Sequence, residues 1–237
     1  MLFWTLLLSH VVGDFPLQTD AIYRLKTKYR WGVLPHVAIC SLMNVLVLSP
    51  YLHLVHTWFA VAFLALVHSL FDKTKISFSE KTARDNLFQF LIDQLLHLFS
   101  VWLAALWLSQ YINPAEYAQT GRFADKEFII QLTAIFTATF AGVPVIYYAQ
   151  KYWCNEVKKY PSPVHYPQLI KRFPGYFERF TATFGLIMGG FWIILAAAAF
   201  IPRILINWHD EDLPSVVVSS LVGLLICLIC SLMVWLI

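Results

Sequence analysis

Charged residues are scarce in this sequence: Asp, Glu, Lys and Arg together make up 13% of its 237 residues, whereas hydrophobic residues make up 59%. A soluble domain carries about 25% charged residues. The low share therefore excludes an ordinary soluble protein and indicates a chain surrounded largely by lipid. The formal net charge is only +3, which also excludes nucleic acid as a partner.

Cysteine is scarce as well, because the chain has only four cysteines and they suggest no disulfide framework. Cys227 and Cys230 match the C-x-x-C spacing, but they lie in an apolar segment, where we expect them to face lipid. The first apolar segment lacks the basic start and the small-residue cleavage site of a signal peptide. No serine- or cysteine-based nucleophile motif, internal repeat or low-complexity run is present. A covalent serine or cysteine hydrolase is therefore not indicated.

Long apolar segments are abundant, and there are seven of them. They cover approximately 2–17, 33–51, 54–72, 87–110, 127–150, 181–202 and 214–237. Each is close to the roughly 17–25 residues that a helix needs to cross a bilayer core. The sequence therefore predicts an all-α fold, a polytopic transmembrane helical bundle of about seven helices. We expect 1–110 to form a four-helix unit and 111–237 to add three further transmembrane helices, with a basic cytoplasmic loop at 151–180.

The basic residues fall in alternate connections. Fourteen of the 17 Lys and Arg residues follow the first, third and fifth apolar segments. Because Lys and Arg are enriched in cytoplasmic loops, this pattern predicts that the N-terminus lies outside and the C-terminus lies in the cytoplasm.

Histidine and aspartate recur at a spacing of four inside the apolar segments. Residues four apart share one face of a helix, so each pair can present two ligands in one direction. Ionisable groups within spanning segments are costly and usually mark a functional site. Three such pairs, together with one further histidine, fall at the predicted cytoplasmic ends of the first four segments. The predicted metal ligands are His10, Asp14, His36, His68, Asp72, Asp93 and His97.

Imidazole and carboxylate groups suit a divalent metal, which we predict to be zinc, with manganese or iron as alternatives. Seven ligands exceed the four that one tetrahedral ion needs, so a site with two ions is also considered. Gln18, Asn86 and Gln94 lie near the same end and are candidates for orienting the ligands. Two other interpretations stay open: a proton or ion pathway in a transporter, and His–Asp pairs that only stabilise a polar core.

Catalytic and substrate-binding roles follow from the same placement. Asp14 or Asp93 could accept a proton from a water activated by the metal. Lys73 could contact an anionic substrate, and Arg179, at the start of the sixth apolar segment, could bind a phosphate.

Three stretches also resemble a known family. They are L-L-L-S-H-V-V-G-D-F-P-L-Q-T-D (6–20), H-S-L-F-D (68–72) and D-Q-L-L-H (93–97), and they are similar to the bacterial membrane family "domain of unknown function 3307". A later G-Y-F-E-R-F (175–180) resembles a stretch of its longer members. The resemblance implies an integral protein of the bacterial cytoplasmic (inner) membrane, and it supports the ligand set without supplying a substrate. A weaker similarity links the pattern to membrane-bound metal-dependent hydrolases of the YdjM type.

Together these observations predict an intramembrane metal-dependent hydrolase. Its site would lie at the cytoplasmic face, and its substrate would be a membrane lipid or lipid-linked small molecule with a phosphoester, ester or amide bond. The alternatives are a metal- or proton-coupled membrane transporter and a non-catalytic subunit whose helices are held together by a metal.

Overall fold

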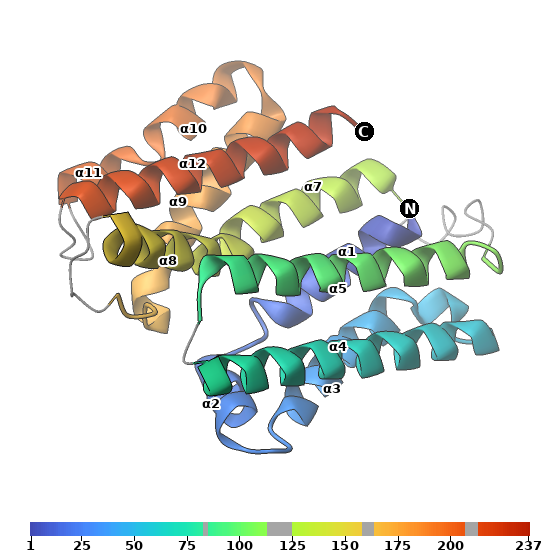
Figure 1. The fold of residues 1–237 in the computed structure, drawn as a ribbon. Helices are drawn as coiled ribbons and strands as arrows, with labels where there is room; N and C mark the ends of the chain where they lie inside the picture. The colour runs from blue at the N-terminus through green and yellow to red at the C-terminus, as the bar shows by residue number, and fades with distance from the viewer. Residues whose placement is uncertain (83–84, 113–124, 158–163, 207–212) are drawn as a thin grey trace. The chain divides into compact units, whose positions relative to one another are not determined.

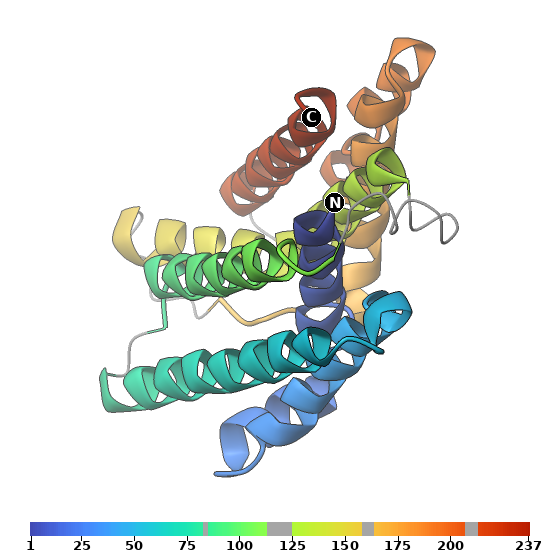
Figure 2. The same cartoon turned by 90° about the vertical axis from the view of Figure 1, so that its right-hand side faces the viewer.

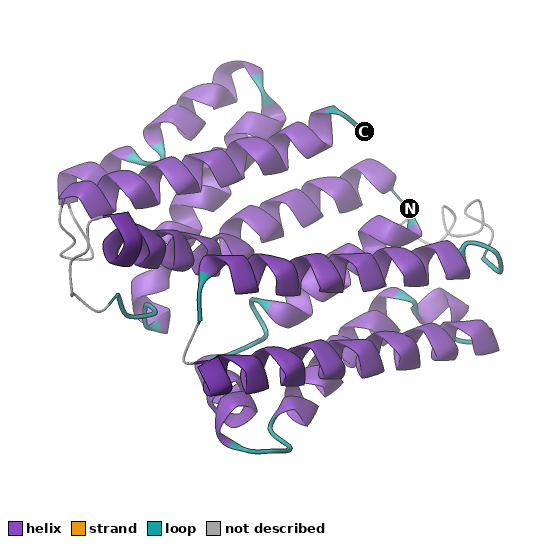
Figure 3. Ribbon diagram, in the orientation of Figure 1, coloured by secondary structure: helices purple, strands orange, loops and turns teal. Residues whose placement is uncertain are grey.

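The computed structural model describes residues 1–82, 85–112, 125–157, 164–206 and 213–237. Every regular element among them is a helix (Figure 3). By length and composition, four helices can cross a membrane: Val55–Lys81, Leu87–Leu108, Lys126–Val157 and Ser215–Trp235. Three further apolar helices are shorter: Leu2–Asp14, Val33–Val47 and Gly190–Arg203. The all-helical, membrane-type fold is thus confirmed, whereas seven spans and the orientation of the termini stay predictions.

The chain divides into two compact units, Met1–Ile129 and Ile130–Ile237. The expected boundary at residue 110 stays a prediction. In the first unit, α1 packs against α3 and α5, and α4 packs against the same two helices, so the four form a closed ring (Figures 1 and 2). The helices of this unit are α1 (Leu2–Asp14), α2 (Asp20–Lys28), α3 (Val33–Val47), α4 (Val55–Thr82) and α5 (Leu87–Leu108).

Two helix ends in the first unit differ from the expected apolar segments. α1 ends at Asp14 instead of residue 17, because Pro16 has no N–H to donate, and the backbone oxygen of Val12 accepts from Leu17 N–H instead. α4 continues to Thr82 instead of ending at residue 72. This extension keeps Lys75 on the same helix as the predicted ligands.

An apolar core fills one end of the ring, which we call the apolar end. The helices alternate in direction, so the starts of α1 and α4 meet the ends of α3 and α5 there. The buried ionisable side chains of the ring lie at the opposite, polar end. The buried residues of the apolar end are Leu2, Leu6, Leu48, Tyr51, Ala60, Val61, Leu64, Val101, Ala104, Ala105, Leu108 and Ile112.

The second unit is also helical. Gly189 and Gly190 have φ values of 65° and 52°, which end α9 and divide the predicted sixth segment, 181–202, into several helices. α9 starts at Leu169, so the last part of the predicted loop at 151–180 is helical. The helices are α7 (Lys126–Phe136), α8 (Gly142–Tyr152), α9 (Leu169–Met188), α10 (Ile193–Ala198), α11 (Ile201–Ile206) and α12 (Leu213–Trp235), with a π-helical turn at Thr137–Ala141 joining α7 to α8.

Cys227 and Cys230 lie inside the second unit, so the expectation that they face lipid is wrong. Both are buried in its core, together with Ala138 and Ala182. The small thiols fit where α12 packs closely against α9, and the Cys227 Sγ lies 3.7 Å from the backbone oxygen of Arg179.

Candidate metal centre

The polar end of the first unit gathers four histidines and three aspartates from four helices. The i and i+4 spacing places each His–Asp pair on the inner face of its helix, and all seven residues are buried. The structure therefore brings the predicted ligands together, although their role as ligands stays a prediction. α1 supplies His10 and Asp14, α3 supplies His36, α4 supplies His68 and Asp72, and α5 supplies Asp93 and His97.

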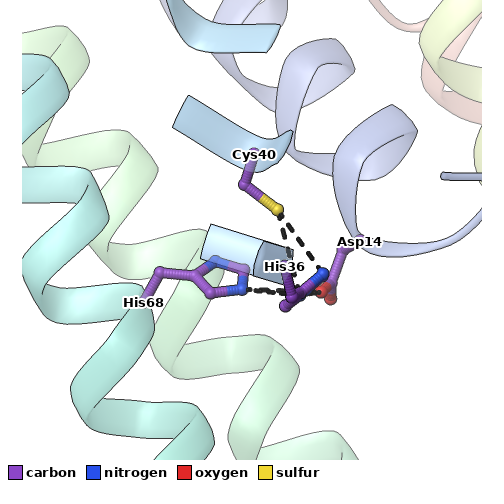
Figure 4. Close-up of side chains that lie close together, drawn as sticks. All are labelled: Asp14, His36, Cys40 and His68. Carbon is purple, nitrogen blue, oxygen red and sulfur yellow. Dashed lines mark hydrogen bonds and ion pairs between the residues drawn. The ribbon is translucent and has the colours of Figure 1, made fainter. Parts of the chain in front are cut away.

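Four donor atoms converge at the centre of this group: the Nε2 atoms of His36 and His68, Asp14 Oδ1 and Asp72 Oδ2. The two Nε2 atoms lie 3.0 Å apart, and His36 Nε2 lies 2.9 Å from Asp14 Oδ1 (Figure 4). His36 Nε2 is 3.6 Å from Asp72 Oδ2, while His68 Nε2 is 3.6 Å from Asp14 Oδ1 and 3.4 Å from Asp72 Oδ2.

Five of the six separations among these four atoms lie near the spacing around a tetrahedral ion. Two groups that share His68 lie close enough to hold an ion: Asp14, His36, Cys40 and His68, and His68, Asp72 and His97. A zinc ion with ligands at about 2.0–2.1 Å holds its donor atoms about 3.3–3.4 Å apart. The measured separations, 2.9 to 3.6 Å, bracket that value. Moreover, Asp72 Oδ2 is buried without a hydrogen-bond partner among the described residues, as expected for an oxygen reserved for a ligand. The side chains present therefore fit a divalent cation.

His97 is held in the tautomer that a metal requires. Its Nδ1 lies 2.8 Å from the backbone oxygen of Asp93, which can only accept, so the proton of the neutral ring is on Nδ1. The other ring nitrogen, Nε2, then carries no proton and has a lone pair that can bind a metal. In the described part of the chain it is buried and has no hydrogen-bond partner. His97 also groups with His68 and Asp72 at distances that could hold an ion.

His10 and Asp93 lie beside the four central atoms. His10 Nε2 is 3.9 Å from Asp14 Oδ2, and its ring stacks on His97 with centroids 5.2 Å apart. Asp93 Oδ2 accepts hydrogen bonds from Lys75 and Gln94, whereas its Oδ1 is buried with no partner in the described residues.

A small cavity borders the histidines on the side of the apolar end. Its volume is about 20 Å³, which is enough for one water molecule. Its polar lining includes His10, His68 and His97 together with Asn44 and Ser100.

Two lysines that sequence reasoning missed enter the cluster. Lys26 Nζ lies 2.7 Å from Asp72 Oδ1, and Lys75 Nζ lies 2.9 Å from Asp93 Oδ2. Burial by itself lowers the pKa of Lys26, but attraction by Asp72 and then Asp14 outweighs it and raises the pKa, so the ammonium stays charged. Lys75 lies three residues after Asp72, and this helical spacing indicates a shared face once α4 is known to continue past residue 72. No spacing in the sequence indicated Lys26.

Cys40 was also missed as a neighbour of the site. Its Sγ lies 3.9 and 4.0 Å from the ring nitrogens of His36, and it groups with Asp14, His36 and His68 (Figure 4). It follows His36 by four residues, the spacing that identified the His–Asp pairs. Gly13 makes room for it: a Cβ on Gly13 would lie 3.0 Å from Cys40 Sγ.

The two predicted substrate-binding residues lie elsewhere. Lys73 is exposed, and its Nζ lies 5.5 Å from the centre of the Trp31 ring. Arg179 belongs to the second unit, where it is buried and donates hydrogen bonds to the backbone oxygens of Ala138 and Thr139. Their roles in substrate binding stay predictions.

A comparison with known protein families matches residues 2–121 to the family described as "protein of unknown function (DUF3307)". The chain belongs to this family. The DUF3307 match covers all seven predicted ligands and both lysines of the cluster, whereas Arg179 lies outside it. Searches of curated proteins and of solved structures gave no significant match. The similarity to hydrolases of the YdjM type stays a prediction.

Proposed function

We propose that this protein is a membrane-embedded, metal-dependent hydrolase that acts at the cytoplasmic face on a lipid-linked substrate. The observation that carries the proposal is that two imidazole nitrogens, 3.0 Å apart, each lie 2.9–3.6 Å from the same two carboxylate oxygens. Mixed nitrogen and oxygen donors favour zinc, with manganese or iron as alternatives. In the proposal, His36, His68, Asp14 and Asp72 hold the ion.

The ion would supply a Lewis acid that acidifies a water molecule and polarises a substrate oxygen. Asp93 is the proton acceptor best supported by its contacts. Lys75 and Gln94 donate to Oδ2 and thereby orient the carboxylate. Oδ1 lies 3.6 Å from His97 Nδ1 and accepts no hydrogen bond in the described residues. Asp14, the other candidate base, is assigned to holding the ion.

The proposal also includes a second ion beside the first. The two oxygens of Asp14 face different partners, because Oδ1 faces His36 and His68 while Oδ2 faces His10 and Gln94. A carboxylate with this arrangement can bridge two ions. His10 and the unprotonated Nε2 of His97 are the side chains that could complete the second position.

Access from one end supports hydrolysis over transport. The buried hydrogen bonds between side chains reach as far as the one from Ser9 to Asn44 Oδ1, 2.8 Å long, whereas Thr57, further along, donates to the backbone oxygen of Tyr51. Beyond the bond from Ser9 to Asn44 lies the apolar end, with Leu6 and Leu48 fully buried. A transporter must open its site to both sides of the membrane, and the described residues offer no polar route through the apolar end.

The first experiment combines metal analysis of the detergent-purified protein with a turnover assay on a membrane lipid extract. We expect about one equivalent of bound zinc per chain and a released lipid product. Saturable metal flux into proteoliposomes without any product would favour a transporter. Bound metal with neither flux nor product would favour a structural ion.

Asp93→Asn separates catalysis from stability. The amide oxygen can still accept from Lys75, while an amide nitrogen replaces the unpartnered Oδ1. We expect turnover to fall by about 10²–10⁴-fold, as for the loss of a general base, with zinc content and thermal unfolding nearly unchanged. If zinc content and thermal stability fell together, the ion would be structural.

A further inference from the structure

Lys26 and Lys75 are the outermost members of the polar cluster. Their side chains are 10% and 26% exposed, whereas the carboxylates of Asp72 and Asp93 that they contact are 3% and 7% exposed. A molecule that approaches the candidate metal centre from the polar end therefore meets Lys75 before the ligands, and it meets Lys26 at the same depth as His10 and Asp14.

The formal charge of the cluster favours an anion once a metal is bound. Three carboxylates and two ammonium groups leave one net negative charge, and a divalent cation reverses this to one net positive charge, since histidine ligands are neutral. A neutral ester or amide would gain little from that positive charge. A phosphate group would be attracted by it, at a site where buried charges are weakly screened.

The lysines also keep hydrogen-bonding capacity. An ammonium group has three N–H donors. The contacts described for Lys26 Nζ are with Asp72 Oδ1 and Gln18 Oε1, and Lys75 Nζ donates to Asp93 Oδ2. Each lysine can therefore hold its carboxylate and still donate to a substrate oxygen.

The surface around Lys26 suits an anionic headgroup. α2 has no fully buried residue, and Arg24, Lys28 and Arg30 are exposed on it and just after it. Basic residues at such a rim raise the local concentration of anions. The exposed aromatic rings of Tyr29 and Trp31 are typical of the depth at which lipid headgroups lie.

We infer that the substrate of the proposed hydrolase is a phosphoester, and that Lys26 and Lys75 bind its phosphate group. This inference rests on the proposed function, and it narrows the substrate from ester, amide or phosphoester to phosphate-bearing molecules. The favoured source is a lipid headgroup, and a soluble phosphoester offers the same chemistry.

The reaction needs only water as a second reactant. The water oxygen forms a new bond to phosphorus, and the bond between phosphorus and the lipid oxygen breaks. Asp93 Oδ1 takes one proton from the water and returns it to the departing lipid oxygen. The products are a lipid alcohol and phosphate, with no oxidation or reduction.

The binding test uses inorganic phosphate and the full-length, zinc-loaded protein in detergent, followed by calorimetry. We expect Lys26→Gln and Lys75→Gln to weaken phosphate binding roughly tenfold to a hundredfold, the usual effect of losing a hydrogen bond from a charged donor. Lys81→Gln is the matched control, because Lys81 is an exposed lysine on the same helix as Lys75, and it should change binding less than about twofold. Lys26→Arg keeps the positive charge and should restore most of the affinity.

Zinc content, measured on each variant, separates this inference from the proposed function. Protein that binds no zinc would contradict the proposed function itself. If zinc binds but phosphate binds equally well to all variants, the lysines only neutralise carboxylates and the inference is wrong. Lys75→Gln keeps this test decisive even if Lys26→Gln loses zinc, because Lys75 contacts Asp93 and none of the four central donors.

The turnover test compares three substrates: vesicles that contain phosphatidate, soluble glycerol phosphate, and diacylglycerol, a neutral lipid that has ester bonds but no phosphate. Release of phosphate from the vesicles, reduced at least tenfold by Lys75→Gln, is the expected result. Release from glycerol phosphate alone would keep the phosphate chemistry but assign a soluble source. Hydrolysis of the neutral ester without release of phosphate would overturn the inference.

Discussion

Both units of this protein bury charged side chains among apolar helices, but the two groups differ in how their hydrogen bonds are met. In the second unit, Arg203 donates to both carboxylate oxygens of Glu178 and to the Ser219 hydroxyl. Arg179 donates to the backbone oxygens that the π-helical turn leaves available. Charged donors and acceptors satisfy one another there. The unpartnered buried atoms of the described residues belong to uncharged groups, hydroxyls such as that of Thr183 and the indole nitrogen of Trp153.

In the first unit, acceptors exceed donors. Asp72 Oδ2, Asp93 Oδ1 and His97 Nε2 are buried without hydrogen-bond partners among the described residues. Unmet acceptors of this kind are costly unless a cation satisfies them. Buried charge is present in both units, so it does not by itself distinguish a candidate site, whereas converging, unmet acceptors are found in the first unit's cluster. That cluster could hold a metal ion.

The largest expected effect is on the structural network. Glu178→Ala would leave the Arg203 guanidinium buried without its carboxylate, which should lower the free energy of unfolding by about 3–5 kcal/mol. Denaturant or thermal unfolding in detergent measures this, with exposed Glu156→Ala as the control, expected within about 0.5 kcal/mol of the unmodified protein. Zinc bound per folded chain should not change. A loss below about 1 kcal/mol would mean that the Glu178–Arg203 pair is not structural.

The second prediction concerns the open cluster. Asp72→Asn keeps an oxygen for Lys26 and places an amide nitrogen, which is not a metal ligand, where Oδ2 lay. We expect zinc affinity to fall by at least about a hundredfold, the upper end of what is lost when only a supporting residue is removed. A competition assay with a zinc chelator measures the change. Unchanged affinity would remove Asp72 from the ligand set.

The smallest expected effect comes from the contact between α1 and α3. A Cβ on Gly13 would lie 3.0 Å from Cys40 Sγ and 3.1 Å from Cys40 Cα, so Gly13→Ala should push apart the helices that carry Asp14 and His36. We expect a destabilisation of about 1–3 kcal/mol and zinc binding several-fold weaker.

Gly223→Ala is the matched control for Gly13→Ala. In the second unit, a Cβ at Gly223 would lie 3.0 Å from Phe200 Cε1, a conflict of similar size. It should therefore destabilise the fold without altering zinc affinity. Equal effects of the two substitutions on zinc would show that the α1–α3 contact does not position Asp14.

The sequence predicted the parts of the site that depend on position within one helix. The spacing of four between His68 and Asp72 is a property of α4 alone, so the shared face could be read directly. The long apolar runs likewise predicted an all-helical membrane protein. Helix ends were harder, because the proline after Asp14 and the two glycines after Met188 interrupt apolar runs that hydropathy treats as continuous.

Contacts between elements could not be predicted in the same way. Lys26 reaches Asp72 only because the short helix α2 lies against the start of α3, and no period in the sequence encodes that placement. Cys40, in contrast, could be identified as a neighbour of the site from the sequence, because it follows His36 by the same spacing of four. Arg179 resembled an anion-binding residue in sequence, but the backbone oxygens that it contacts become available only through the π-helical turn.

The shortness of α1 has a consequence for the bilayer. Its 13 residues make a helix about 20 Å long, against a hydrocarbon core of roughly 30 Å. If α1 crosses the bilayer as predicted, with its start level with one surface of that core, Asp14 would end below the headgroups of the other. The bilayer beside it would then thin, a hydrophobic mismatch. Acyl-chain length would then control how far a headgroup must descend to reach the centre.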